Sequence, residues 1–193
     1  RLIATGKAAH GARPELGRNA IHSLAQCIVA IETDYAALLR KRRHPLLGHA
    51  TINTGTIRGG AQPNIVPDRC EADLDRRTLP GETFANIRRE LLGVLARRGL
   101  KAKLIDVKGF TCPALETDPG LPWVRDFMRA ARQRKPLGVD YYCDAANLAG
   151  AGIPTVVWGP GDIAQAHTAD EWITLEQLER GTGMLTRFLL SLP

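Results

Sequence analysis

The segment GGAQPNIVPDRCEADLDRRTLPGE, residues 59–82, decides the fold of this 193-residue chain. Apolar and charged side chains alternate along its middle, with Val66, Cys70, Ala72 and Leu74 on one face and Arg69, Glu71, Asp73 and Asp75 on the other. A period of two predicts a half-buried strand over 65–76, of the kind found in antiparallel sheets. Breakers on both sides, RGGAQPN and LPGE, predict turns.

The flanking segments complete the order β-α-β-β-α-β. Apolar residues recur every three and four positions over 18–39 and 83–98, which predicts two helices with one buried face each. Strands are expected at 1–9, 49–58 and 101–107. Two helices on one face of a four-stranded antiparallel sheet form the split βαβ, or ferredoxin-like, sandwich. This fold serves many functions, so by itself it indicates none.

A breaker-rich stretch, CPALETDPGLP at 112–122, predicts a boundary between a domain at 1–112 and a second one at 113–193. In the second region we expect helices at about 121–134, from about residue 144, and at 175–190. We also expect a short strand just before residue 144 and a buried, parallel-type strand at 155–158. Thr174 and Gln177 are spaced as a capping box for the last helix. Two strands do not make a stable sheet, so this α/β region is expected to need more strands from elsewhere.

Composition places the chain among ordinary soluble proteins, because 44% of its residues are hydrophobic and no apolar run approaches the roughly 20 residues of a membrane span. The net charge of +6 comes partly from basic clusters at 40–43 and 97–103. These lie at predicted helix ends, where cations are favourable, and no aromatic residues interleave with them as in nucleic-acid-binding surfaces. The four scattered cysteines predict free thiols in a reducing, cytoplasmic compartment. The chain opens inside an expected strand without an initiator Met, which suggests a truncated or processed polypeptide.

Five polar residues at strand–loop junctions are candidates for a site: His10, Asn64, Arg77, Asp144 and His167. Each has an ordinary structural explanation, as a surface histidine, a turn asparagine, an exposed arginine, a helix cap and a loop histidine. Arg76 and Arg77 end the central strand, and one is expected to point to each face. An arginine can grip a carboxylate, and a neutral imidazole can ligate zinc or polarise a carbonyl. The motifs H-x-D, H-E-x-x-H and G-x-S-x-G are missing, as is a full set of zinc ligands.

Three stretches carry a specific resemblance: GKAAHGARPELGRNAI at 6–21, the segment at 59–82, and GPGDIAQAHTADEWI at 159–173. In this order they resemble the family of co-catalytic zinc metallohydrolases that contains acetylornithine deacetylase, succinyl-diaminopimelate desuccinylase and carboxypeptidase G. The last stretch is most similar to the acetylornithine deacetylase branch. The resemblance covers essentially the whole chain. It implies a lid or dimerisation domain with the ferredoxin-like fold, followed by the C-terminal portion of an α/β zinc-peptidase-like catalytic domain.

The resemblance also implies roles for single residues. His167 matches a terminal ligand to one of two zinc ions, for which cobalt or manganese are alternatives. His10 matches the lid histidine that reaches the partner subunit's active site and holds the developing oxyanion, which implies a homodimer. Asn64 and Arg77 match lid residues that bind the substrate carboxylate and line the oxyanion region. Asp144 matches a motif beside the site that contacts substrate.

The implied reaction is attack of zinc-activated water on the amide bond of an N-acyl amino acid or small peptide. The remaining metal ligands and the catalytic base belong to the family's first half, so this chain alone is expected to be the inactive C-terminal half. The alternative is a non-catalytic dimerisation or ligand-binding module with the same fold. The joint presence of His10, Asn64, Arg77 and His167 argues against it. No nucleic-acid or membrane partner is expected.

Overall fold

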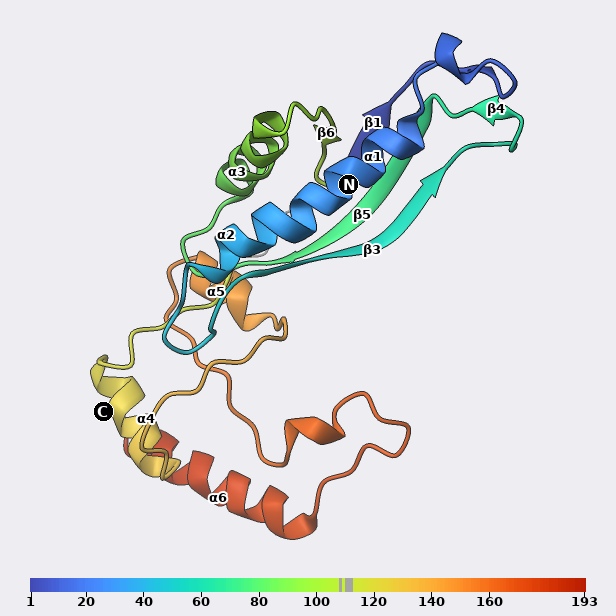
Figure 1. Cartoon of the computed structure of the whole chain (residues 1–193). Coiled ribbons are helices and arrows are strands. Elements are labelled where there is room, and N and C mark those ends of the chain that lie inside the picture. The colour runs from blue at the N-terminus through green and yellow to red at the C-terminus, as the bar shows by residue number, and fades with distance from the viewer. Residues whose placement is uncertain (108, 110–112) are drawn as a thin grey trace. The chain divides into compact units, whose positions relative to one another are not determined.

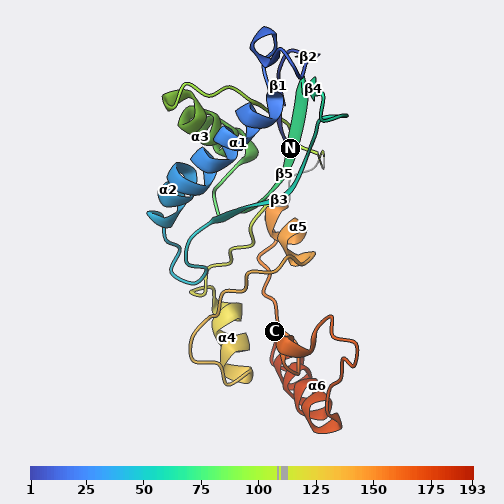
Figure 2. The ribbon, with the colours of Figure 1, turned by 45° about the vertical axis from the view of Figure 1, so that its right-hand side comes forward.

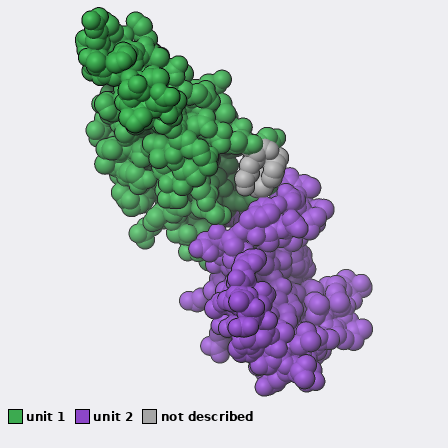
Figure 3. Space-filling model, turned by 90° about the vertical axis from the view of Figure 1, so that its right-hand side faces the viewer, with its two compact units in different colours: residues 1–114 green, residues 115–193 purple. Residues whose placement is uncertain are grey.

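The computed structural model describes residues 1–107, 109 and 113–193, in two units that comprise Arg1–Ala114 and Leu115–Pro193 (Figure 3). Their assignment to a lid and to part of a catalytic domain stays a prediction. Cys27, Cys70 and Cys143 are free thiols, and Cys112 lies outside the described residues. Burial raises the pKa of the Cys27 and Cys70 thiols, which keeps both protonated.

The first unit contains the expected four-stranded antiparallel sheet. Its strand order is β3 (Thr51–Gly59), β5 (Arg69–Arg77), β1 (Leu2–Thr5) and β6 (Lys103–Leu104) (Figure 1). One face carries the helical segments α1 (Ala20–Ala30), η2 (Ile31–Tyr35), α2 (Ala36–Arg40) and α3 (Phe84–Arg97) (Figures 1 and 2). The ferredoxin-like sandwich is therefore confirmed.

Capping residues set the helix ends in this unit. The Asn19 side chain accepts hydrogen bonds from the first backbone N–H groups of α1, and Thr83 caps α3 in the same way. Gly99 follows α3 with a φ of +70°, a left-handed conformation that suits glycine and stops the helix. The predicted helix over 83–98 is thus confirmed to within a residue at each end.

The core of the first unit lies between the sheet and the helices. The inward side chains of the strands, Leu2, Ala4, Cys70 and Ala72, are almost fully buried against helical residues that include Leu24, Cys27, Ala30, Leu91, Val94 and Leu95. Burial of one large aliphatic side chain stabilises a fold by about 1.5–3 kcal/mol. The first unit therefore has a hydrophobic core of its own.

The predicted strand over 65–76 is wrong as one continuous element. Pro67 interrupts it because proline has no N–H to donate to a sheet. Residues before the break form β4 (Ile65–Val66), which pairs with β2 (Ala9–His10) in a separate two-stranded ribbon. The predicted strand over 1–9 is likewise divided into β1 and β2. The 3₁₀ turn η1 (Pro14–Leu16) follows β2.

Two further elements differ from their predicted form. The expected helix over 18–39 runs to Arg40 but contains the π-helical segment η2, in which each turn is one residue wider than in an α-helix. Tyr35, the last residue of this segment, is fully buried. The expected strand over 101–107 is reduced to the two residues of β6.

The second unit contains α4 (Pro122–Ala130), α5 (Ala145–Gly150), the 3₁₀ turn η3 (Ile163–Gln165) and α6 (Leu175–Leu190). The predicted capping box of Thr174 and Gln177 at the start of α6 is confirmed. Phe127 of α4 packs edge-on against Phe188 of α6, with ring centroids 4.8 Å apart, and against Trp158 at 5.9 Å. These contacts form a small second core, completed by Met184.

The predicted strand at 155–158 is wrong, since the described part of the second unit contains no strand. A parallel strand needs neighbouring strands for its backbone groups, and here the Thr155 backbone N–H donates instead to the Thr117 side chain. Trp158 is 38% exposed, and Leu185 and Leu189 of α6 are 39% and 55% exposed. Among the described residues, no helix is both long and apolar enough to cross a membrane.

Candidate active site

His10 and Asn64 are brought together by the β2–β4 ribbon. His10 pairs with Ile65 across the ribbon, and the Gly11 N–H donates to the Asn64 carbonyl oxygen at 2.7 Å. A side chain at position 11 would place its Cβ only 2.9 Å from that oxygen, so the close approach requires glycine. Both polar side chains are exposed at this end of the first unit.

The local backbone selects the tautomer of His10. The Ala12 N–H donates to His10 Nδ1 at 3.1 Å, so Nδ1 is the acceptor of the ring. A neutral imidazole in this arrangement carries its hydrogen on Nε2, which is free to donate outward. The Arg13 N–H also donates to the His10 carbonyl oxygen at 2.8 Å and closes a tight turn. His10 is therefore a pre-oriented hydrogen-bond donor.

The Asn64 side chain makes no hydrogen bond to any described residue, so its amide is available to a ligand. An open hollow beside the ribbon is lined by His10 together with Lys7, Arg13 and Leu16. The hollow can accept an anionic or carbonyl-bearing molecule, because the Lys7 and Arg13 cations and the His10 N–H donor all favour negative charge on oxygen.

Arg77 lies at the opposite end of the sheet. It is the last residue of β5, whereas the ribbon adjoins the first residue of β5, Arg69. At roughly 3.3 Å per residue, these ends are separated by about 26 Å. Arg77 points outward, is exposed, and forms an ion pair with Asp75 at 2.9 Å. One copy of the chain therefore does not bring His10 and Arg77 to the same small ligand.

The two remaining candidates lie on the second unit. Asp144 precedes α5, but its side chain does not cap the helix and has Tyr142 Oη at 3.5 Å instead. His167 has a φ of +62°, which is uncommon for any residue except glycine, and its N–H donates to Glu171 Oε2 at 3.1 Å. Unusual backbone of this kind is concentrated at functional sites, so His167 stays a candidate.

The residues described here do not fit a metal ion by themselves. No group of three or more His, Cys, Asp or Glu side chains within residues 1–107, 109 and 113–193 is arranged to hold one. Catalytic zinc needs three protein ligands, and His167 supplies at most one. Sequence reasoning missed the ion pair of Arg77 with Asp75 and the buried partners of Arg76, which involve Tyr35 and Glu82. The sequence predicted only that Arg76 and Arg77 point to opposite faces, without saying which of them points inward.

Residues 1–103 match the profile of the peptidase dimerisation domain, M20_dimer. The chain therefore belongs to the M20 family of peptidases. This finding confirms the family that the three sequence stretches resemble.

Individual relatives agree with this assignment. The chain is 31% identical to acetylornithine deacetylase of Proteus mirabilis over 189 residues, which cover 91% of the chain and 46% of that enzyme. Its fold is similar to the crystal structure of the aminopeptidase PepT from Bacillus cereus, with a TM-score of 0.69 and 26% identity over 97% of this chain and 49% of the other. The M20 family metallo-carboxypeptidase Sso-CP2 from Sulfolobus solfataricus has the same fold, with a TM-score of 0.61 and 18% identity over 97% of this chain and 57% of the other. The chain spans about half the length of the curated relatives it matches.

Proposed function

We propose that the protein containing this chain is a metal-dependent amidohydrolase that cleaves N-acyl amino acids or small peptides, as an acetylornithine deacetylase does. The observation that carries the proposal is that the β2–β4 ribbon brings His10 and Asn64 to one end of a dimerisation domain, with Arg77 at the other end. Similarity to acetylornithine deacetylases and to an aminopeptidase supports the reaction class. A cytoplasmic location is part of the proposal.

Each of the three residues has a chemical task in this proposal. His10 donates from Nε2 to the oxygen of the amide carbonyl as negative charge develops on it. The Asn64 amide provides a second donor beside it. The Arg77 guanidinium binds the free carboxylate of the amino acid with two parallel hydrogen bonds. Asp144 contributes a further substrate contact from the second unit.

The separation of His10 from Arg77 requires two copies of the chain. We propose a homodimer in which Arg77 serves the active site of its own subunit and His10 of the partner subunit completes it. The sheet edge formed by β3 suits the contact, because β3 is nine residues long and no described strand pairs with its outer side, whereas β6 at the other edge has two residues. Such an edge tends to pair with a second strand.

We further propose that His167 ligates one of two zinc ions and that the remaining ligands lie outside residues 1–193. The chain covers only 46% of the Proteus mirabilis relative, which leaves room for further ligands in the remainder of such a protein. The second unit also exposes apolar side chains that further protein would cover, among them Trp158, Leu185 and Leu189. A bound divalent ion would polarise the carbonyl and activate water.

Complementation between two impaired variants of the full-length protein tests the proposal. At substrate concentrations below KM, His10→Ala and Arg77→Met should each retain little activity as homodimers, the first through a lower kcat and the second through a higher KM. In mixed dimers, one site combines an intact Arg77 with an intact His10 of the partner subunit. Random mixing makes half of the dimers mixed with one working site each, so about a quarter of the wild-type activity should return.

Failure to recover activity, with mixed dimers verified by mass spectrometry, would exclude the proposed sharing of sites. Full activity of both single variants on N-acyl amino acids would remove His10 and Arg77 from the reaction, whereas a metal-loaded wild type without activity would favour the non-catalytic alternative, a dimerisation or ligand-binding module. The control is each variant taken through the same subunit exchange alone and at the same concentration, so that only the complementary subunit is missing.

A further inference from the structure

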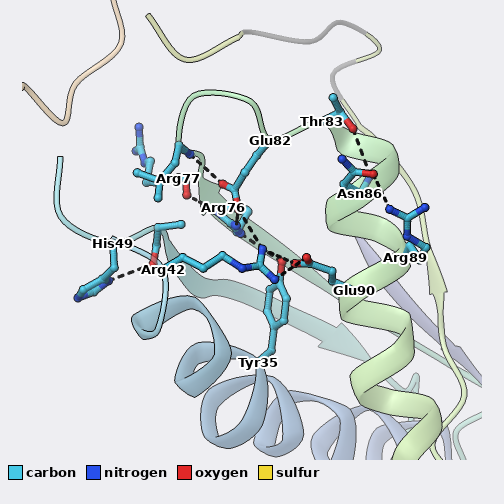
Figure 4. Close-up of polar contacts among 12 residues, drawn as sticks. Tyr35, Arg42, His49, Arg76, Arg77, Glu82, Thr83, Asn86, Arg89 and Glu90 are labelled. Carbon is cyan, nitrogen blue, oxygen red and sulfur yellow. Dashed lines mark hydrogen bonds and ion pairs between the residues drawn. The ribbon is translucent and has the colours of Figure 1, made fainter. Parts of the chain in front are cut away.

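A cluster of charged side chains lies at the end of the sandwich from which Arg77 projects (Figure 4). It consists of Tyr35, Arg42, Arg76, Glu82 and Glu90, and we refer to it as the strand-end cluster. Its members come from η2, the segment after α2, the end of β5, the following turn, and α3. The two arginines and two glutamates balance in formal charge.

Arg76 is the centre of the strand-end cluster. Its side chain is 9% exposed, and its Nη2 lies 2.6 Å from Glu82 Oε1. Its Nε donates to Tyr35 Oη at 3.3 Å, and its Cζ lies 5.9 Å from the centroid of the Tyr35 ring. Its Nη1 donates to the backbone carbonyl oxygen of Arg77. The inward arginine thus bonds directly to the backbone of the outward one.

Glu82 connects this arginine to the turn that follows β5. Its Oε2 accepts a hydrogen bond from the Leu79 N–H at 2.8 Å, and its own N–H donates to the Leu79 carbonyl oxygen at 3.1 Å. The backbone on the C-terminal side of Arg77 is therefore held to Arg76 through Glu82. On the N-terminal side, the backbone is held by the pairing of β5 with β3, in which Arg76 lies opposite Ile52 and Arg77 lies opposite Thr51.

The outer part of the cluster is a separate ion pair. Arg42 contacts both carboxylate oxygens of Glu90, at 2.6 and 3.1 Å, and its side chain is 44% exposed. Arg42 approaches Glu82 only to 3.9 Å. This pair belongs to the same cluster and joins α3 to the segment after α2, but it makes no hydrogen bond to β5 or to the turn after it.

Stability alone is a weak reason to keep a nearly buried arginine side chain at this position. An ion pair that is removed from water loses much of its Coulomb energy to desolvation, and an apolar residue of similar volume often serves a fold as well. The hydrogen bonds of Arg76 instead immobilise one particular backbone segment. That segment carries the guanidinium to which the proposed function assigns the substrate carboxylate.

We propose that Arg76 is a positioning residue for Arg77. With its hydrogen bonds to Tyr35, to Glu82 and to the Arg77 carbonyl, it sets the direction in which the Arg77 side chain leaves the sheet before substrate binds. A two-pronged arginine–carboxylate contact demands a defined geometry, so ordering the backbone in advance increases the affinity for a carboxylate. This inference rests on the proposed function of Arg77.

The test compares two substrates of the full-length protein, an N-acyl amino acid and the matching carboxamide. The double variant Arg76→Met/Glu82→Gln removes the inner pair without leaving a buried charge behind. We expect KM for an N-acyl amino acid to rise roughly tenfold while kcat changes less than about twofold, because binding is weakened and the reacting bond is not. KM for the matching carboxamide, which lacks the free carboxylate, should not change. A purely structural role of Arg76 would move both substrates together.

Arg42→Met/Glu90→Gln is the matched control, since it removes the outer pair of the same cluster in the same chemical way. We expect it to leave the ratio of the two KM values unchanged. If the inner double variant does not fold, as judged by circular dichroism, Tyr35→Phe removes one acceptor of Arg76 and should raise the carboxylate KM roughly threefold.

Arg77→Met separates failure of this inference from failure of the proposed function. If Arg77→Met abolishes the preference for the carboxylate and the Arg76 variants retain it, the positioning role is overturned and the function of Arg77 stands. If Arg77→Met retains the preference as well, both are overturned. A selective rise of KM for the carboxylate in both sets of variants supports both.

Discussion

At the residue scale, the Arg77 guanidinium already has a carboxylate partner, that of Asp75. Asp75 lies two residues before it on the same face of β5, and both side chains of this ion pair are more than half exposed. An exposed pair of this kind contributes about 0–1 kcal/mol. Under the proposed function, the Asp75 carboxylate competes with the substrate carboxylate for the guanidinium without excluding it.

Asp75→Asn should lower KM for N-acyl amino acids by about two- to fivefold, because the guanidinium is released from its partner. Steady-state kinetics of the full-length protein measure this effect. Asp126→Asn, which removes an exposed ion pair with Arg129 on α4, is the control and should have no effect. An unchanged KM for Asp75→Asn would mean that Asp75 does not compete with the substrate carboxylate for Arg77.

His10→Ala should lower kcat of the full-length protein by about 10²- to 10³-fold, the usual effect of losing one donor to a developing oxyanion. The dimer should persist, since His10 is an exposed side chain on a two-residue strand. Kinetics and light scattering measure the two properties. His22→Ala, an exposed histidine on α1, should leave both unchanged. Unchanged turnover in His10→Ala would remove His10 from the reaction.

At the element scale, α1 holds the sandwich together through one buried face. Leu24→Ala should lower the free energy of unfolding by about 2–5 kcal/mol, because Leu24 is fully buried and the sheet below it is rigid. Val29→Ala on the same helix, where the side chain is 57% exposed, should change it by less than about 0.5 kcal/mol. Urea denaturation of both variants gives the comparison. Similar losses in the two would contradict the assigned face of the helix.

Three strands are joined on the outer face of the sheet by Asp73. It accepts hydrogen bonds from Arg1 at 2.8 and 3.2 Å and from Thr56 at 3.0 Å. The hydrogen bond from Arg1, followed by that from Thr56, lowers the pKa of Asp73 to about 2. The folded state therefore favours the ionised carboxylate more than the unfolded state does.

The stabilisation from Asp73 is complete above its unfolded pKa of about 3.9 and is lost as the pH falls through about 2. Asp73→Asn should therefore reduce the decline in unfolding free energy between about pH 4 and pH 2. Urea denaturation across this pH window measures the decline. Asp170 is an exposed loop residue of the second unit, and Asp170→Asn should leave the decline in unfolding free energy as in the wild type. Equal declines in the wild type and Asp73→Asn would show that Asp73 has no such role.

At the scale of the whole molecule, the proposed reaction depends on groups beyond the described residues. The 193-residue chain alone should retain less than one equivalent of zinc after dialysis and should not hydrolyse N-acyl amino acids, because its described residues form no metal-ligand cluster. The full-length protein should lose activity with a chelator and regain it with zinc. Metal analysis and amide hydrolysis assays measure both. Tight stoichiometric zinc and activity in the isolated chain would contradict the prediction.

The amino-acid sequence alone was sufficient for features that depend on near neighbours in the chain. The alternation that places Cys70 and Ala72 inward, the capping box at Thr174 and the stop at Gly99 were all predictable. Periodicity and capping are local properties, because they arise from the geometry of a single strand or helix. The family could be recognised for a related reason, since its motifs are short and lie in order.

Only the tertiary structure decided which distant segments meet. It divided the expected strand at Pro67, paired β2 with β4 so that His10 lies beside Asn64, and left 155–158 without a strand partner. It also separated His10 from Arg77 by the length of β5, about 26 Å. These outcomes depend on pairing between residues far apart in the chain, where the available partners rather than local preference determine the structure.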